Sequence, residues 1–160
     1  MPSFLPVQRT AEQQLAIIGY KIDNVPKNND SFFESIARQK NITAYKLRKM
    51  LQDMAFQSNR EIRDKHNFAR NLGTAKMWNS EWIPQIMQLL DECGIRVVIY
   101  RDHKLPTANT ILIDMVLDAC CVHIVETESG HFNGARSTLH YSTNWLVGEM
   151  NEQVYGSGKY

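Results

Sequence analysis

The chain has 160 residues, of which 43% are hydrophobic and 22% are charged, and its formal net charge is +1. These are the values of one globular domain of ordinary size. A net charge this close to zero gives no electrostatic reason to expect binding to nucleic acid or to a membrane surface. No apolar run in the chain approaches the roughly 20 residues that a membrane-spanning helix needs.

The cysteines indicate a reducing compartment. Cys93, Cys120 and Cys121 are an odd number, and two of them are adjacent in an apolar stretch. We therefore expect buried thiols rather than disulfides, in the cytoplasm. Residues 1–10 also lack the apolar stretch of a secretion signal. No Cys-x-x-Cys or His-x-x-x-His spacing is present, so the sequence predicts no metal site and no cofactor.

The N-terminal stretch is predicted to hold one short element. Residues 1–10 are expected to be a loose end. Residues 11–18 are apolar enough for a short helix or strand, which Gly19 ends. Residues 21–27 contain Pro26 and are predicted to be a loop.

A capped helix follows. Asp30 is a good N-cap residue, because its carboxylate can accept a hydrogen bond from a free amide of the first turn. Ser31 is then the first helical residue, and the helix is predicted to run to Gln39. Phe32 and Ile36 lie one turn apart and are expected to face the core.

A second helix is predicted to begin after Thr43, its N-cap. Leu47, Leu51 and Met54 recur at helical spacing and define its apolar face. The other face is expected to be solvated, and it carries Lys46, Arg48, Lys49 and Asp53.

The middle of the chain contains a polar stretch and an apolar helix. Residues 57–76 are predicted to be either a helical arm or a mobile loop. Ser80 is predicted to cap a helix that includes Trp82, with Pro84 tolerated in its first turn. Gly94 is the expected C-terminal stop of that helix.

The last part of the chain is predicted to form strands. Residues 95–100, 110–117 and 119–125 are rich in Ile and Val, and a loop over residues 127–138 leads to His140. The order of elements predicts an α+β domain with a small, central mixed β-sheet flanked by helices.

Two features could carry chemistry. A group at Ser31 would lie among unpaired amides at the positive end of a helix dipole, where an anion or an oxyanion is stabilised. An ordinary capped helix would have the same sequence. Among the histidines, His66, His103 and His131 lie in polar stretches and are expected to be exposed, whereas His123 is expected to be a core or edge residue of a strand.

The order of motifs resembles the OTU (ovarian tumour) family of cysteine proteases, which are deubiquitinases. Its members carry Asp-Gly-x-Cys-aromatic or aliphatic-Phe at a helix start, then a Trp-containing helix, a strand and a closing His-aromatic pair. Phe32 and Phe33 match the residues after the nucleophile, and His140 and Tyr141 match the closing pair. The Leu47-Arg48 pair also resembles the family, and the resemblance covers residues 20–145.

The resemblance implies a papain-like OTU fold for a single domain of residues 1–160, with loose ends at residues 1–10 and 147–160. It implies that Ser31 stands where the family has its nucleophilic Cys, and that His140 is the base. The family's third member would be Asn28, with Ser142 or Asn144 as alternatives. The expected oxyanion donors are the backbone amides of Asp30 and Ser31.

The function implied is thiol-dependent hydrolysis of isopeptide bonds at the ubiquitin C-terminus. Because Ser31 replaces Cys, the chain is expected to be an inactive Cys-to-Ser form that binds ubiquitin or polyubiquitin chains. The alternative is a natural pseudoenzyme that binds ubiquitin without cleaving it. The family also implies that residues 57–76 contact the distal ubiquitin, in the cytoplasm or, for a secreted effector or viral protein, in the host cytosol.

Overall fold

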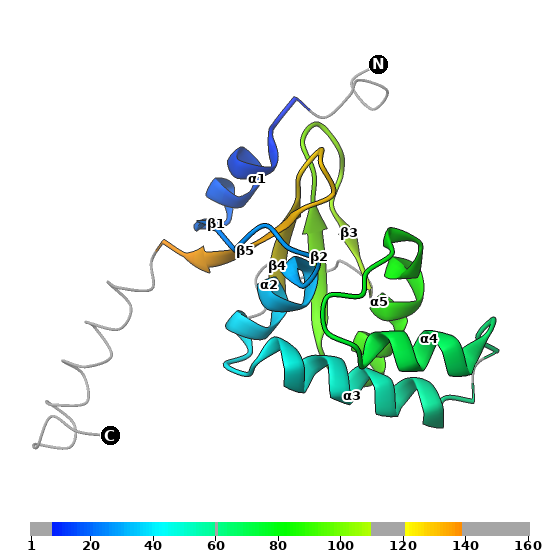
Figure 1. Ribbon diagram of the computed structural model, residues 1–160. Helices are drawn as coiled ribbons and strands as arrows, with labels where there is room; N and C mark the ends of the chain where they lie inside the picture. The colour runs from blue at the N-terminus through cyan, green and yellow to red at the C-terminus, as the bar shows by residue number, and fades with distance from the viewer. Residues whose placement is uncertain (1–7, 60, 110–120, 139–160) are drawn as a thin grey trace, which may run out of the picture.

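The computed structural model describes residues 8–59, 61–109 and 121–138 (Figure 1). Within these ranges, a run of helices is followed by a run of strands, as in an α+β domain. The helices are α1 (Ala11–Ile17), α2 (Ser31–Gln39), α3 (Ala44–Gln57), α4 (Lys65–Leu72), the short 3₁₀ helix η2 (Ser80–Trp82) and α5 (Ile83–Glu92). The strands are β1 (Tyr20–Asp23), β2 (Arg96–Tyr100), β3 (Thr107–Ala108), β4 (Cys121–Glu126) and β5 (Phe132–Ser137).

The described strands form one mixed sheet in the order β1-β5-β4-β2-β3. Strands β2 and β4 are parallel, with Val98 opposite His123, and the other neighbouring pairs are antiparallel. The predicted fold class, α+β with a mixed sheet flanked by helices, is therefore confirmed. No helix in these ranges is long and apolar enough to cross a membrane.

The two faces of the sheet are covered by different helices. Side chains alternate across β2, so that Val97 and Ile99 face the larger core while Val98 and Tyr100 face the smaller one. The larger core contains residues from α2, α3, α4 and α5, and the smaller core lies beneath α1. In Figure 1, α1 lies apart from α3, α4 and α5, on the side of the β1 and β5 strands.

Strands β4 and β5 pair over a short length only, at Val125 with Asn133 and at Glu126 with Phe132. Beyond that point the side chain of Gln39, at the end of α2, replaces the missing strand. Its Nε2 donates to the carbonyl of His123 at 2.8 Å, and its Oε1 accepts from the His123 amide at 3.1 Å. The side-chain amide thereby satisfies both backbone groups of one strand residue.

Helix ends agree closely with the sequence predictions. Helix α2 spans Ser31–Gln39, and Thr43 caps α3 by accepting a hydrogen bond from the Lys46 amide at 3.0 Å. The sequence did not decide between helix and strand for residues 11–18, and Ala11–Ile17 form helix α1. The two predicted glycine stops, Gly19 and Gly94, both have the positive φ that glycine tolerates.

Three local predictions were wrong. The expected loop over residues 21–27 begins as strand β1, whose Ile22 lies opposite Ala135 of β5. The expected loop over residues 127–138 contains β5, because two glycines within it concealed a strand pattern. The cap of the Trp82 helix is not Ser80 but Asn79, whose Oδ1 accepts from the Glu81 amide at 2.9 Å.

The remaining strand predictions fall partly within and partly outside the residues that the structure describes. Residues 95–100 correspond to β2, and the described part of residues 119–125 belongs to β4. Residues 110–117 lie outside the described residues. Cys121 is a buried thiol, as expected, whereas the Cys93 thiol is half-buried. Cys120 lies in the same undescribed range as residues 110–117.

Candidate active site

A surface pocket of about 530 Å³ opens at the start of α2. It joins three parts of the chain: the loop before α2, the segment before α5, and the turn between β4 and β5. Its lining residues are Lys27, Asn28, Asn29, Ser31, Trp78, Asn79, Ser80, Ser129, Gly130 and His131. The pocket therefore brings Ser31 and a histidine to the same cavity.

Ser31 lies at the first position of α2, as predicted, and is only 4% exposed. Its Oγ accepts a hydrogen bond from the amide of Phe132 at 3.1 Å. The Phe132 N–H and the helix N-terminus both present positive charge to this atom. An anion at this position would be stabilised by the same groups.

His131 is held by Asn133. Nε2 of His131 lies 3.0 Å from Oδ1 of Asn133, and the same oxygen accepts from the Val25 amide at 2.9 Å. A backbone N–H can only donate, so the atom facing Val25 is the amide oxygen, and the histidine must donate to it as well. Neutral His131 then carries its proton on Nε2, and Nδ1 keeps a free lone pair.

Aromatic packing joins the chain segments that carry Ser31 and His131. Phe32 and Phe132, the residues that follow them, meet edge to face with ring centroids 5.0 Å apart. Trp78, which lines the pocket, stacks on Phe32 at 5.0 Å and meets Phe132 at 5.9 Å. Because three rings lock one another, the segments that carry the two polar side chains are fixed relative to each other.

The backbone amides of Asp30 and Ser31 form hydrogen bonds within the loop that precedes α2. The Asp30 amide donates to Oδ1 of Asn28 at 2.8 Å, and the Ser31 amide donates to the Asn28 carbonyl at 3.2 Å. Asn28 is exposed and lines the same pocket as His131. The two expected oxyanion donors are therefore engaged within the loop, and an oxyanion at the Asp30 amide would have to displace the Asn28 side chain.

Asp30 occupies the N-cap position but does not cap with its side chain. Its Oδ1 instead accepts from Arg48 and from the Lys76 amide, at 2.9 Å in the latter case. Arg48 was expected on a solvated face of α3, and this was wrong, because its side chain is 2% exposed. The predicted capping carboxylate serves as the partner of a buried cation.

His140, Ser142 and Asn144 lie outside the described residues, so the structure brings only Ser31 and Asn28 of the predicted triad together. Sequence reasoning missed His131 and Asn133, having assigned His131 to an exposed loop, whereas it is half-buried. A signal was available in Gly130-His131-Phe132-Asn133. Here a histidine is followed by an aromatic residue and, two positions on, by an asparagine that can orient it.

His123 has a structural environment, as expected. It is fully buried in β4, and its Nδ1 lies 2.9 Å from the hydroxyl of Tyr100. Its Nε2 has no hydrogen-bond partner within the described residues. Burial lowers the pKa of His123 to about 4, so the ring is neutral at physiological pH.

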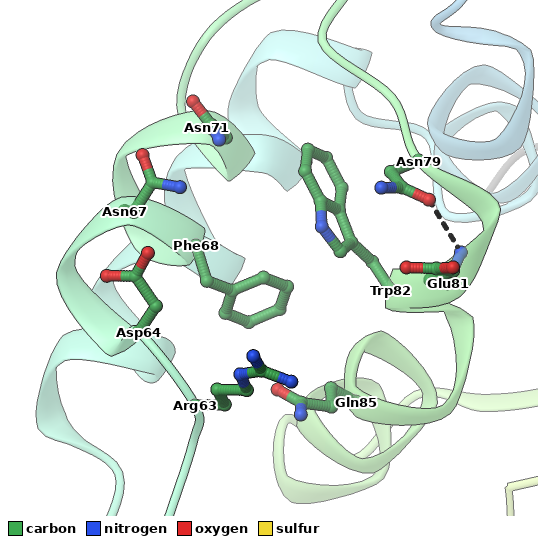
Figure 2. Close-up of a pocket in the computed structure, with 9 residues that line it drawn as sticks. All are labelled: Arg63, Asp64, Asn67, Phe68, Asn71, Asn79, Glu81, Trp82 and Gln85. Carbon is green, nitrogen blue, oxygen red and sulfur yellow. Dashed lines mark hydrogen bonds between the residues drawn. The ribbon is translucent and has the colours of Figure 1, made fainter.

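A second pocket, of about 570 Å³, lies between α4 and the start of α5 (Figure 2). Phe68 and Trp82 meet edge to face in it, with ring centroids 5.9 Å apart. Polar side chains surround these rings, namely Arg63, Asp64, Asn67, Asn71, Asn79, Glu81 and Gln85. The sequence did not decide whether residues 57–76 form a helical arm or a loop. They contain helix α4, which contributes to a polar surface pocket with two aromatic rings.

Comparison by sequence gives no relative: no family model matches the chain, and no curated protein does. Comparison by structure gives several. An OTU deubiquitinase from Wolbachia pipientis wMel bound to ubiquitin is similar with a TM-score of 0.56 and 15% identity, over 75% of this chain and 97% of that chain. The Hazara virus OTU bound to ubiquitin is similar with a TM-score of 0.58 and 13% identity, over 74% and 81%.

The OTU domain of OTUD1 is also similar, with a TM-score of 0.54 and 8% identity, over 79% of this chain and 91% of that chain. At such identities a likeness concerns the fold alone. The mixed sheet and its covering helices therefore give this chain an OTU-like fold.

Proposed function

We propose that this chain is an OTU-type deubiquitinase domain in which Ser31 replaces the nucleophilic Cys, so that it binds ubiquitin and turns it over little or not at all. The observation that carries the proposal is the single pocket lined by Ser31, at a helix N-terminus, and by His131, which Asn133 orients. An acyl-transfer site needs a nucleophile, a base and a group that fixes the base.

The proposed base is His131, and Asn133 is the third member in place of Asn28. With Nε2 committed to Asn133, Nδ1 is the atom that can take a proton. Asn28 is better suited to the loop itself, because its Oδ1 already accepts from Asp30. The amides of Asp30 and Ser31 remain the proposed oxyanion donors: movement of the Asn28 side chain frees the first, and a shift of the Asn28 carbonyl frees the second.

In the Ser31→Cys form the introduced thiol would give its proton to His131, and the thiolate would add to the carbonyl carbon of the isopeptide bond. The imidazolium then protonates the departing lysine amine, and a thioester remains on the sulfur. Water hydrolyses the thioester, with His131 again accepting the proton. A serine hydroxyl is far harder to ionise than a thiol, which is why the present chain is proposed to be inactive.

Ubiquitin is the proposed partner because two of the similar structures are described as bound to ubiquitin. The polar surface with Phe68 and Trp82 is the proposed contact for the distal ubiquitin, since aromatic and arginine side chains are enriched at protein interfaces. A thiol enzyme of this type suits a reducing cytoplasm.

A second candidate function is ubiquitin binding without catalysis. It is favoured by the bond from the Phe132 amide to Ser31 Oγ and by the burial of Ser31. Both are what a serine retained for structure would show, because a buried hydroxyl needs a hydrogen-bond partner.

The test is to measure cleavage of ubiquitin chains and of a fluorogenic ubiquitin C-terminal amide by the Ser31→Cys form. Ser35→Cys is the matched control, because Ser35 is buried one turn further along the same helix and bonds the Ser31 carbonyl at 2.6 Å. We expect cleavage by the first variant and none by the second. A folded Ser31→Cys form that binds ubiquitin but cleaves no linkage would favour the non-catalytic candidate, and absence of binding at millimolar ubiquitin would remove both.

A further inference from the structure

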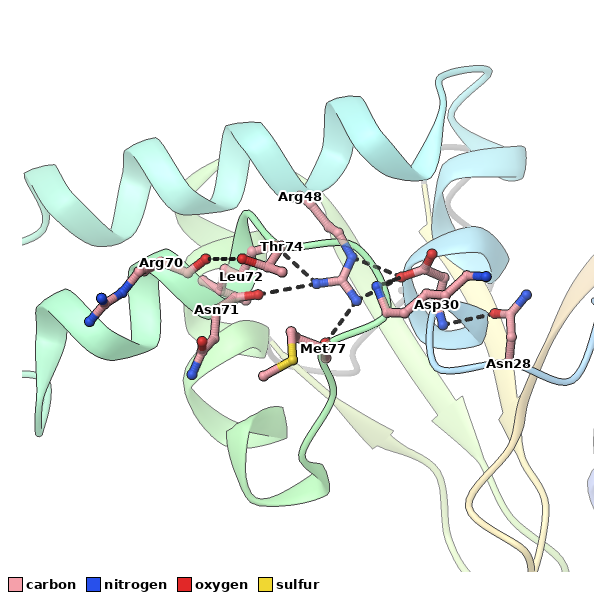
Figure 3. Close-up of polar contacts among 9 residues, drawn as sticks. Asn28, Asp30, Arg48, Arg70, Asn71, Leu72, Thr74 and Met77 are labelled. Atoms are coloured by element: carbon pink, nitrogen blue, oxygen red, sulfur yellow. Dashed lines mark hydrogen bonds and ion pairs between the residues drawn. The ribbon is translucent and has the colours of Figure 1, made fainter.

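Arg48 is a buried cation on α3 that contacts several parts of the chain at once (Figure 3). Its Nε and Nη2 lie 3.0 and 2.7 Å from Oδ1 of Asp30. Nη1 donates to the carbonyl of Leu72 at 3.0 Å, and Nη2 donates to that of Met77 at 2.8 Å. The guanidinium also lies over the ring of Phe33, 4.1 Å from its centroid.

These partners adjoin two walls of the site pocket. Asp30 directly precedes Ser31, and Met77 directly precedes Trp78, the first of three consecutive residues that line another part of the same pocket. A third tie, to Leu72, fixes the end of α4. One side chain thus sets the position of the loop that carries Ser31 against the segment that faces it.

The chemistry of arginine suits this task better than that of other residues. A guanidinium is planar and presents donors in fixed directions, so it can hold a carboxylate and two carbonyls together, whereas an ammonium acts as a point charge. Burial lowers the pKa of Arg48, and the hydrogen bond and charge of Asp30 oppose that effect. Well-packed apolar side chains often stabilise a protein core as much as a buried ion pair does. Stability alone therefore does not explain the pair of Arg48 and Asp30.

We propose that Arg48 and Asp30 are positioning residues, which hold the loop before Ser31 and the segment from Met77 onward at the separation that the reaction requires. This inference rests on the proposed function. Removing the Asp30 carboxylate should move the nucleophile away from His131 and leave the surface around Phe68 and Trp82 in place, because Arg48 still bonds the end of α4. A displacement of about 1 Å can cost on the order of 100-fold in rate.

The test uses four substitutions made individually in the Ser31→Cys form. Asp30→Ala removes the acceptor of Arg48, whereas Asp30→Asn keeps an oxygen that can accept the same bonds without the charge. Arg48→Lys keeps the charge but cannot reach both walls. Glu34→Ala is the matched control, because it removes a carboxylate from the first turn of the same helix, where Glu34 pairs only with Arg38 at 3.5 Å among the ion pairs described.

We expect Asp30→Ala and Arg48→Lys to lower kcat roughly 10- to 100-fold. KM should stay within about threefold in Asp30→Ala, which keeps the bond from Arg48 to Leu72 at the end of α4. Asp30→Asn should keep most of the activity, and Glu34→Ala should leave it unchanged. Melting temperatures show which variants are folded. Equal losses of kcat in Asp30→Asn and Asp30→Ala would assign the effect to charge and would overturn the proposal. An unchanged kcat in a folded Asp30→Ala protein would overturn it as well.

A readout without ubiquitin separates this proposal from the proposed function. Alkylation of the introduced thiol by iodoacetamide, followed by mass spectrometry of its peptide, reports thiolate formation directly. If Asp30 is a positioning residue, alkylation should be slower in Asp30→Ala, because the displaced sulfur is stabilised less as a thiolate by the helix N-terminus and His131. Loss of negative charge alone predicts faster alkylation in both Asp30 variants, and that result would refute positioning even if the Ser31→Cys form cleaved no ubiquitin.

Discussion

Acid should destabilise this protein through His123. Its ring is fully buried, and burial lowers its pKa from 6.5 to about 4. Between these two values the unfolded chain binds a proton at His123 and the folded chain does not. Stability is therefore fully present above pH 6.5 and is lost as the pH falls towards 4.

The size of the effect follows from the difference in pKa. A shift of about 2.5 pH units corresponds to about 3 kcal/mol of unfolding free energy, most of it lost by pH 4.5. Among the described residues the ring contacts the hydroxyl of Tyr100 and the rings of Tyr20 and Tyr100, and no carboxylate is found against it to offset this effect. A domain of this size has only about 5–15 kcal/mol of stability in total, so the loss is large.

The assay is denaturant unfolding followed by tryptophan fluorescence at a series of pH values from 7.5 to 4.5. His123→Gln is the test variant, because a neutral amide can still bond Tyr100 but cannot take up the proton. His66→Gln is the control, because His66 is exposed on α4. The parent and the control should lose about 2.5 kcal/mol more than His123→Gln over this range. Parallel losses in all three proteins would refute the reasoning.

Two further outcomes are expected. In the Ser31→Cys form, His131→Ala should lower kcat/KM by about 10² to 10⁴, more than His140→Ala does, and the reverse order would return the role of base to His140. Gly134→Ala should lower the unfolding free energy by about 1–3 kcal/mol, because the new Cβ would lie 3.1 Å from the backbone oxygen of Ser35; an unchanged denaturation midpoint would show that α2 yields there.

Local signals in the sequence predicted the helices well. Thr43, Gly19 and Gly94 act through their own backbone or the next turn, so their neighbours in sequence suffice to identify them. The same holds for Ser31 as the first residue of α2. The fold class also followed from the order of elements, because each apolar face needs a partner.

Features that depend on distant parts of the chain were not predictable in this way. From the sequence alone, Asp30 is predicted to cap α2 with its carboxylate. The fold instead brings Arg48, which is 18 positions away, next to that carboxylate. Arg48 itself looks like a surface residue, since nothing in α3 shows that its face meets α4 and the Met77 segment. His131 appears in a glycine-containing loop, and only the pairing of β5 with β1 and β4 turns the next residue towards Ser31.

The glutamine at the end of α2 has a consequence for how the sheet is built. Because the side chain of Gln39 supplies both the donor and the acceptor for His123, the sheet keeps its bonding where β4 and β5 separate. A glutamate would lack the donor, and an asparagine would be one carbon too short. The Gln39 side chain thus takes the place of a strand residue beside β4, so β5 can pair with β1 further along without leaving the backbone groups of His123 unpaired.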